Sequence, residues 1–251
     1  MPGRHSKATI ISMAVISMGL AALLHEALGH AIPAWLRGDM VTQLTSNHLS
    51  DLRPDRLVET GGTIVNLFAG AVALAASFRA RPNLRFFLWF FAAVNLLDGA
   101  GYFLFSGISG TGDWAAVIAG LPQQVVLRAA MAIFGAVLYF LCLKLLAIGL
   151  RPFLATRSEY NTIGRLPYLA ACAFYCVAGA FDPLGIRLLF LSTIPAAFGG
   201  LSGLLWADGL LPGHAQLEPL RVTPSPAWWW TAGVFALVFI LTLGRGINFS
   251  H

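Results

Sequence analysis

The chain has 251 residues, of which 57% are hydrophobic and only 11% are charged, and its mean hydropathy is +0.74. This composition excludes a soluble globular domain and indicates an integral membrane protein. The formal net charge of +5 favours contact with anionic lipid, and no pattern in the chain indicates a nucleic-acid partner.

A membrane span needs about 20 mostly apolar residues to cross a hydrocarbon core of roughly 30 Å. We predict roughly seven spans, between six and eight, at residues 8–36, 61–78, 86–105, 125–148, 166–181, 184–206 and 228–243. Asp182 and Pro183 either divide two short spans or kink one longer excursion. The expected fold class is therefore all-α, a polytopic transmembrane helix bundle that forms one integral membrane domain over residues 1–251.

The first span follows Arg4 and Lys7, an outline that also fits a secretory signal peptide. The apolar character continues through Leu36, so we expect an uncleaved first span. The placement of Lys and Arg in the connecting segments favours a cytoplasmic N-terminus by a small margin. We expect a multi-pass protein of the cell membrane.

Ionisable residues near the end of the first span are the most informative feature of the chain. His25, Glu26 and His30 stand in the sequence His-Glu-Ala-Leu-Gly-His. Charged and imidazole side chains are costly in a hydrocarbon-length segment, so they indicate a functional site. Of the 11 acidic residues, only Glu26 and Asp98 lie clearly within predicted spans.

Two histidines and a carboxylate match the ligands that zinc takes in catalytic sites, which keep one position open for water. His25, His30 and Asp98 would supply three ligands, and Glu26 would remain as the general base. The two histidines are five residues apart, however, which on an ideal α-helix separates their directions by about 140°. A single-turn π-bulge would absorb the extra residue, and Gly29 makes such a distortion easier.

The sequence around His25 resembles the zinc helix of the site-2 protease class of intramembrane metalloproteases, which carry H-E-x-G-H-A, with one residue inserted. The six-residue form also resembles the zinc motif of the soluble dipeptidyl peptidase III family. Residues 61–66 with Ala69 are similar to the G-P-x-x-N-x-x-x-A span of the membrane family, although Gly62 replaces its proline. Residues 95–99 resemble its N-x-x-P…D-G segment, with a shorter spacing.

The resemblance covers residues 23–99, so a metalloprotease-like core is expected at about 8–105 and additional helices at about 125–247. It implies a zinc metalloendopeptidase that hydrolyses peptide bonds of membrane-associated protein substrates. The implied roles are Zn²⁺ binding by His25, His30 and Asp98, water activation by Glu26, and substrate binding by Asn66, with Asn95 beside it.

Other interpretations remain open. The histidines could form an interfacial pair, and intramembrane His and carboxylate groups also occur in metal or proton transporters. A degenerate protease that binds a helix without cutting it would carry the same motif. Asp113 follows a glycine-rich loop, where we expect it to cap a short interfacial helix rather than bind metal.

Overall fold

The computed structural model describes residues 4–51, 55–211 and 218–249 of the chain. The described part is predominantly helical, and five of its helices are long and apolar enough to cross a membrane. These helices cover Lys7–Leu36, Arg56–Ser77, Pro82–Ser109, Gln124–Phe153 and Pro226–Gly244.

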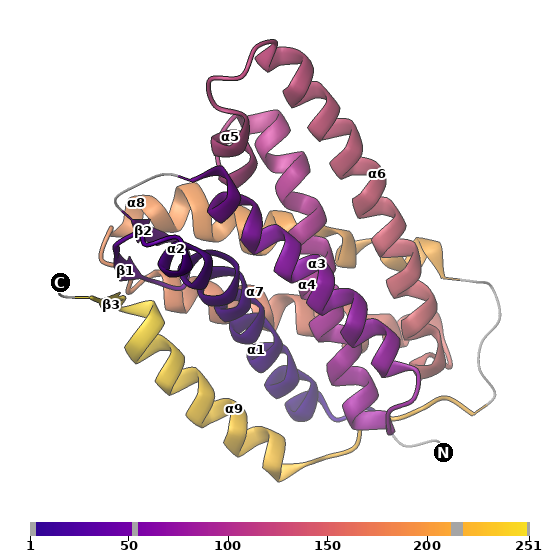
Figure 1. Cartoon of the computed structure of the whole chain (residues 1–251). Helices are drawn as coiled ribbons and strands as arrows, with labels where there is room; N and C mark the ends of the chain where they lie inside the picture. Colours follow the sequence, from indigo (N-terminus) through magenta and orange to yellow (C-terminus); the bar gives the residue numbers. More distant parts are fainter. Residues whose placement is uncertain (1–3, 52–54, 212–217, 250–251) are drawn as a thin grey trace.

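The first of these helices is composite. It begins with α1 (Lys7–Leu23), continues as the π-helical segment η1 (Leu24–Ala31) and ends as α2 (Ile32–Leu36). It crosses the middle of the molecule (Figure 1), where α1 packs against α4 (Pro82–Ser109) and η1 packs against α3 (Arg56–Ser77). The residues that carry the sequence motif are thus at the centre of the bundle.

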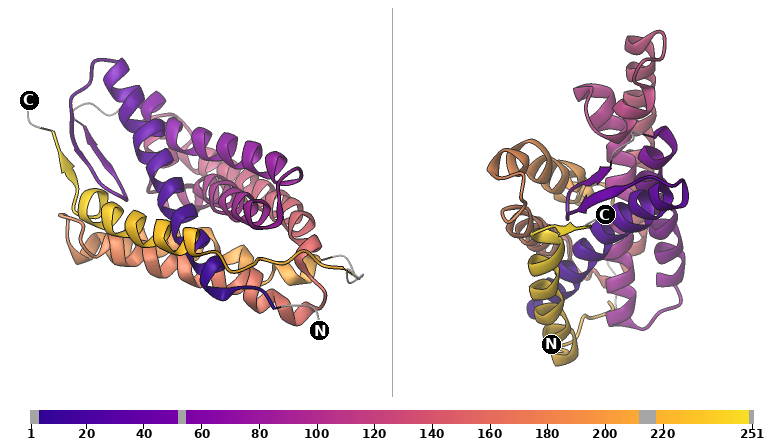
Figure 2. Two further views of the ribbon diagram at one scale, coloured as in Figure 1. Left: turned by 90° about the horizontal axis from the view of Figure 1, so that it is seen from below. Right: turned by 60° about the vertical axis from the view of Figure 1, so that its left-hand side comes forward.

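The remaining helices enclose α1. α6 (Gln124–Leu150), which continues into the short η2 (Arg151–Phe153), packs against α4, whereas α7 (Leu166–Gly179) and α9 (Pro226–Phe239) pack against α1. Both views of Figure 2 show α9 on the side of α1 away from α6. α9 continues into η9 (Ile240–Gly244), and α7 is preceded by η3 (Arg157–Glu159) and η4 (Asn161–Arg165).

Two of the seven predicted spans are not among the long apolar helices. Residues 166–181 contain the 14-residue α7, and residues 184–206 contain the short apolar helix Ile186–Gly199. This helix changes type along its length, from α8 (Ile186–Leu188) to η5 (Leu189–Thr193) and η6 (Pro195–Gly199), and is followed by η7 (Ser202–Leu205) and η8 (Ala207–Leu210). Glycine weakens helix interiors, and the helix ends near Gly199, Gly200 and Gly203.

A small antiparallel sheet also departs from the all-α prediction. It has the strand order β2-β1-β3, with β1 at Val41–Leu44, β2 at Leu49–Asp51 and β3 at Ile247–Asn248. β1 and β2 form a hairpin between α2 and α3, and β3 joins the end of the chain to it.

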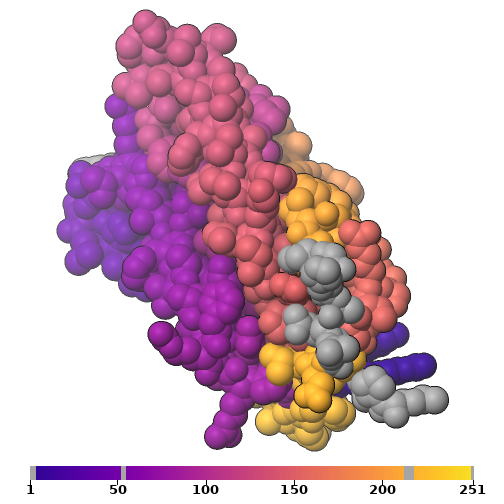
Figure 3. Space-filling model, turned by 90° about the vertical axis from the view of Figure 1, so that its right-hand side faces the viewer, coloured from indigo at the N-terminus to yellow at the C-terminus, as the bar shows by residue number. Residues whose placement is uncertain are grey.

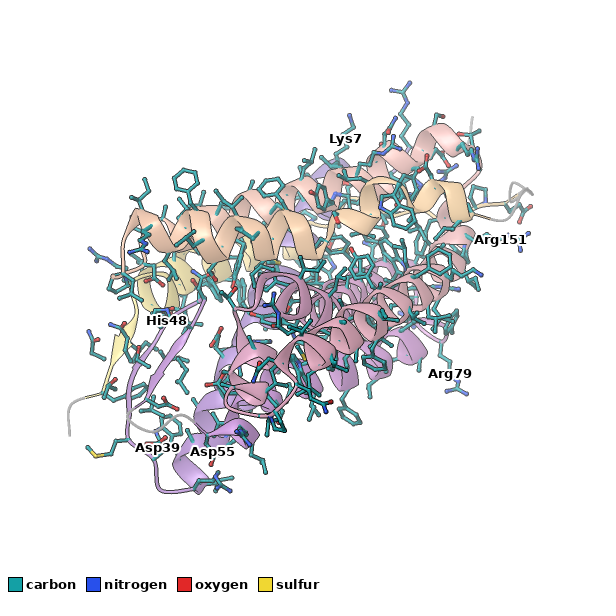
Figure 4. All side chains as sticks on the ribbon, turned by 90° about the horizontal axis from the view of Figure 1, so that it is seen from above. Lys7, Asp39, His48, Asp55, Arg79 and Arg151 are labelled. Carbon is teal, nitrogen blue, oxygen red and sulfur yellow. The ribbon has the colours of Figure 1, made fainter. Side chains whose placement is uncertain are left out.

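The two ends of the bundle differ in charge. Figure 4 places Arg79 and Arg151 toward one end, called here the basic end, and Asp39, Asp55 and His48 toward the other, with Lys7 nearer the middle of the view. The β1–β2 hairpin lies at this second end, the hairpin end. The sides between the two ends are apolar, as on α6, which runs along one face in Figure 3 and exposes 68% of Ile133.

Candidate metal and catalytic site

The π-helical segment η1 brings the two histidines together. The backbone N–H of Ile32 donates to the carbonyl of Ala27, which is the wide i to i+5 turn of a π-helix. The His25 and His30 rings lie with their centroids 4.8 Å apart and are both buried. The prediction of a π distortion is therefore confirmed, and it removes the divergence that an α-helix would impose.

Glycines allow η1 to lie directly against α3. A Cβ atom on Gly61 would meet the Gly29 carbonyl oxygen at 1.8 Å, and one on Gly29 would meet the Gly62 Cα at 2.4 Å. A Cβ on Gly62 would lie 2.5 Å from His25 Nε2 and 2.6 Å from His30 Nε2. The two Nε2 atoms consequently face the same small space beside Gly62, and only glycine leaves that space open.

A backbone carbonyl sets the orientation of His30. His30 Nδ1 lies 2.8 Å from the carbonyl oxygen of Val58 on α3, to which its N–H donates. This hydrogen bond places the proton on Nδ1 and leaves the lone pair of Nε2 directed toward the space beside Gly62. Ligating histidines in metalloproteins are commonly held in this way.

Asp113 completes the group of ligand atoms. Its Oδ2 lies 3.2 Å from His25 Nε2 and 3.5 Å from His30 Nε2. It is the first residue of α5 (Asp113–Ile118), and the N-cap is Gly112, so the expectation that Asp113 caps this helix is wrong. The carboxylate instead points at the two imidazoles.

Two features hold Asp113 in this position. The loop before it turns sharply, with φ of +73° at Gly110 and +83° at Gly112, a region that favours glycine. The next residue, Trp114, donates its indole N–H to Thr63 Oγ1 on α3 at 3.0 Å. Its ring also packs on Phe103 of α4, with centroids 4.3 Å apart. α5 is thus attached to the same helix that carries Gly62.

The charge state of Asp113 suits a ligand. Burial raises the pKa of Asp113, but the adjacent imidazoles of His25 and His30 outweigh burial and hold the pKa well below its usual range. This lowering comes from imidazoles that donate hydrogen bonds to the carboxylate; as metal ligands the imidazoles would instead be neutral at Nε2 and the carboxylate ionised.

Asp98 lies on the opposite side of the His25 ring from Asp113. Its Oδ2 is 4.0 Å from His25 Nδ1 and accepts a hydrogen bond from Asn66 Nδ2 at 2.9 Å. Asn66 Nδ2 also lies 3.2 Å from His25 Nδ1. The structure therefore brings both predicted residues to His25, but to the nitrogen that faces away from Asp113.

Asn95 is not brought to the histidines by these contacts. It is fully buried in α4, where its Nδ2 donates to the Phe91 carbonyl at 2.8 Å.

Glu26 lies where it can reach both of the cavities around η1. Its side chain is 5% exposed, and its Oε2 has no hydrogen-bond partner among the described residues. The larger cavity has a volume of about 110 Å³ and is bordered by Glu26, His30, Asp113 and Tyr102. Tyr102 also stacks on His25, with ring centroids 4.9 Å apart. A buried, unpaired carboxylate beside the ligand group has the placement of a general base.

Two of the three separations in the ligand group suit a zinc ion, and all three ligand atoms lie within 4.8 Å of one another. With metal–ligand bonds of about 2.0–2.2 Å, tetrahedral coordination separates two ligand atoms by roughly 3.3 Å. The distances of 3.2 and 3.5 Å from Asp113 Oδ2 to the two Nε2 atoms match this separation. His25 Nε2 and Asp113 Oδ2 are buried and have no partner among the described residues outside the ligand group itself, so an ion between them would satisfy both.

Asp113 is the site residue that the sequence interpretation did not assign to the metal. It lies beyond residue 99, where the resemblance ends, and outside the predicted spans. Its position directly after a loop with three glycines in residues 107–112 was the available signal, since such a loop can return the chain to the helix it has just left.

Comparison of the chain with protein-family models, with curated proteins and with solved structures found no match. The functional interpretation rests on the geometry of the site.

Proposed function

We propose that this protein is an integral membrane zinc metalloendopeptidase whose metal ligands are His25, His30 and Asp113 and whose general base is Glu26. The observation that carries the proposal is the convergence of three buried ligand atoms within 4.8 Å of one another, next to an unpaired carboxylate and an open cavity. Asp98 takes a different role from the one the sequence suggested.

In this role Asp98 and Asn66 position His25 rather than bind metal. Ligating histidines are commonly held by a second hydrogen-bonding partner at the other ring nitrogen, and residues of this kind typically change metal affinity 10–100-fold when mutated. Asn66 Oδ1 is a buried acceptor without a partner. Exchange of its amide nitrogen and oxygen would let Oδ1 accept the Nδ1 proton of a His25 that binds metal through Nε2, and Asp98 Oδ2, 2.9 Å away, would then be protonated and donate its O–H to Oδ1.

The chemistry is hydrolysis of a peptide bond. Zinc at such a site supplies Lewis acidity, which activates water and polarises a carbonyl group. Glu26 removes a proton from the attacking water as the oxygen bonds to the carbonyl carbon. Glu26 then delivers this proton to the departing nitrogen when the C–N bond breaks. Burial of Glu26 keeps bulk water from competing for its unpaired oxygen.

The architecture supports hydrolysis over ion transport. A transport pathway would require polar groups that continue toward both ends of the bundle. The smaller cavity, of about 20 Å³, is bordered by Met18 and Val94 as well as by Glu26 and Asp98. Further along α1 the buried residues are apolar or carry hydroxyl groups, so no carboxylate or imidazole of α1 continues the site toward the basic end.

We place the basic end on the cytoplasmic side and the hairpin end on the opposite side of the cell membrane. Cytoplasmic segments carry an excess of Lys and Arg, and Arg79 and Arg151 lie at the basic end, with Lys7 nearer the middle of the molecule in the view of Figure 4. The exposed apolar faces of α6 and α9 would contact lipid. Substrates would be membrane-associated proteins that reach the cavity from the hairpin end.

The test is metal content and cleavage measured on the same samples. Protein purified in detergent should hold close to one zinc per chain by elemental mass spectrometry, and His25→Ala should lose it. Incubated with a peptide library, the wild type should release new N-termini, detected by mass spectrometry, and Glu26→Gln should not. A wild type without zinc after zinc has been supplied and excess removed would refute the proposal.

A further inference from the structure

The cavity in front of the ligand group is lined mainly by acceptors. The hairpin contributes Asn47, His48 and Asp51, and the first turn of α3 contributes Glu59, which directly follows the Val58 that orients His30. Glu26, His30 and Asp113 close its inner side. Figure 4 shows His48 at the hairpin end, where the cavity lies.

Several of these acceptors lack partners. Asn47 Oδ1 is buried without a hydrogen bond among the described residues, and the whole residue is 9% exposed. Glu26 Oε2 is likewise buried without a hydrogen bond among the described residues. A buried acceptor that is left unpaired destabilises the fold, so these atoms indicate a donor that comes from outside the chain.

Asp51 and Glu59 differ from other carboxylates of the protein. Asp55, Glu159 and Asp208 each pair with an arginine. In the described ranges, neither Asp51 nor Glu59 forms an ion pair with Lys or Arg. Burial and the nearby charge of Asp39 raise the pKa of Asp51, so its charged form is not compensated within the protein.

A second metal ion fits this region less well than an organic cation. The only group of three His, Cys, Asp or Glu ligand atoms that converges in the described part of the chain is His25, His30 and Asp113. A cavity of about 110 Å³ compares with roughly 10–15 Å³ for one water by the same measure, so it admits several water-sized groups.

We infer that the cavity bordered by Asn47, Asp51 and Glu59 is a specificity subsite for a basic side chain of the substrate, the ammonium of lysine or the guanidinium of arginine. The inference rests on the proposed peptidase function, because it places this side chain close to the bond that is cut. Ammonium and guanidinium groups carry only donors and match a cavity with unpaired acceptors. Hydrogen bonds between ionised partners are also about twice as strong as neutral ones.

The test determines which bonds the zinc-loaded protein cleaves in a peptide library derived from cell proteins. Cleavage sites should be enriched roughly tenfold for Lys or Arg within three residues of the cut bond. The variant Asp51→Asn/Glu59→Gln should lose the enrichment while it still cleaves. Asp208→Asn, which removes a charge paired with Arg165 outside the cavity lining, should keep it.

A charge reversal distinguishes specificity from damage. Asp51→Arg should shift the preference toward Asp and Glu, a result that misfolding cannot produce. Unchanged enrichment in the double variant, or wild-type cleavage without basic residues near the cut, would overturn the subsite and leave the peptidase proposal intact.

A binding experiment separates this inference from the peptidase proposal. n-Butylammonium should raise the thermal midpoint of Glu26→Gln protein in detergent, whereas the neutral n-butanol at equal concentration should not. The effect should disappear when Asp51→Asn and Glu59→Gln are added. If n-butylammonium binds but the wild type cleaves nothing, the peptidase proposal is wrong and the cation site stands. Equal effects of n-butylammonium and n-butanol would refute the cation site.

Discussion

Two π-helical regions of the molecule have similar backbones but carry different kinds of side chain. η1 carries His25, Glu26 and His30 with their side chains buried, whereas η5 and η6, over residues 189–199, carry no titratable residue. η1 lies on α3 through glycine contacts, and η5 and η6 pack on α7. A wide turn is therefore not a site by itself. It becomes one where the neighbouring helix leaves space and other elements supply charge.

The sequence after three of the π-helical segments indicates what favours these turns. η1 ends at Ala31, η4 at Arg165 and η5 at Thr193, and each is followed two residues later by a proline, at 33, 167 and 195, whereas η6 and η9 are not. Proline cannot donate to the carbonyl four residues before it and crowds that carbonyl. A wider turn upstream relieves the conflict. In η1 the displaced carbonyl belongs to Gly29, which faces Gly61 on α3.

The largest expected effect comes from Glu26, the carboxylate that η1 has and that η5 and η6 lack. Glu26→Gln should keep zinc and lower the cleavage rate by about 10²–10⁴-fold, because the amide cannot accept the proton from water. Ser192→Ala in η5 should leave the rate unchanged. Cleavage assayed beside zinc content checks both variants, and full activity in Glu26→Gln would contradict the role of Glu26.

The next effect tests the space beside the ligands. Gly62→Ala would place a methyl group 2.5–2.6 Å from both Nε2 atoms, so stoichiometric zinc should be lost. Gly233→Ala in α9, where a Cβ meets nothing within 4 Å, is the matched control and should keep zinc. Zinc retained by Gly62→Ala would mean that the ion binds elsewhere.

A smaller effect separates the two aspartates. Asp113→Ala removes a ligand and should abolish stoichiometric zinc, whereas Asp98→Asn should weaken zinc binding by about 10–100-fold, as expected for a residue that acts through His25. Competition with a chelator of known affinity gives both values. The reverse order would assign the metal to Asp98, as the sequence resemblance implied.

The smallest expected effect concerns Pro33, the proline that follows η1. Pro33→Ala restores the backbone donor and should favour an α-helical path through residues 24–31, which turns the two histidines apart. We expect roughly tenfold weaker zinc binding. Pro195→Ala makes the same change behind η5 and should leave zinc affinity as it is. Equal affinities in all three proteins would show that packing against α3, rather than Pro33, holds the π turn.

The sequence determined the helical membrane character, the histidine pair with Glu26, and the need for a π distortion between them. These follow from composition and from spacing within one segment, which are local properties. It overestimated the number of long spans, because hydropathy registers apolar character and not where a helix begins and ends, and α7 and Ile186–Gly199 are shorter than a span. It also did not anticipate the three-stranded sheet, whose β3 pairs with β1 across about 200 residues.

Tertiary structure alone decided which carboxylate reaches the histidines. Asp98 has the better sequence context, but its position on α4 brings it to Nδ1 of His25, while the turn at Gly110 and Gly112 and the Trp114–Thr63 hydrogen bond bring Asp113 to Nε2. An imidazole presents two nitrogens in opposite directions. Which one a carboxylate faces depends on helix packing and loop path, which no local pattern in the chain encodes.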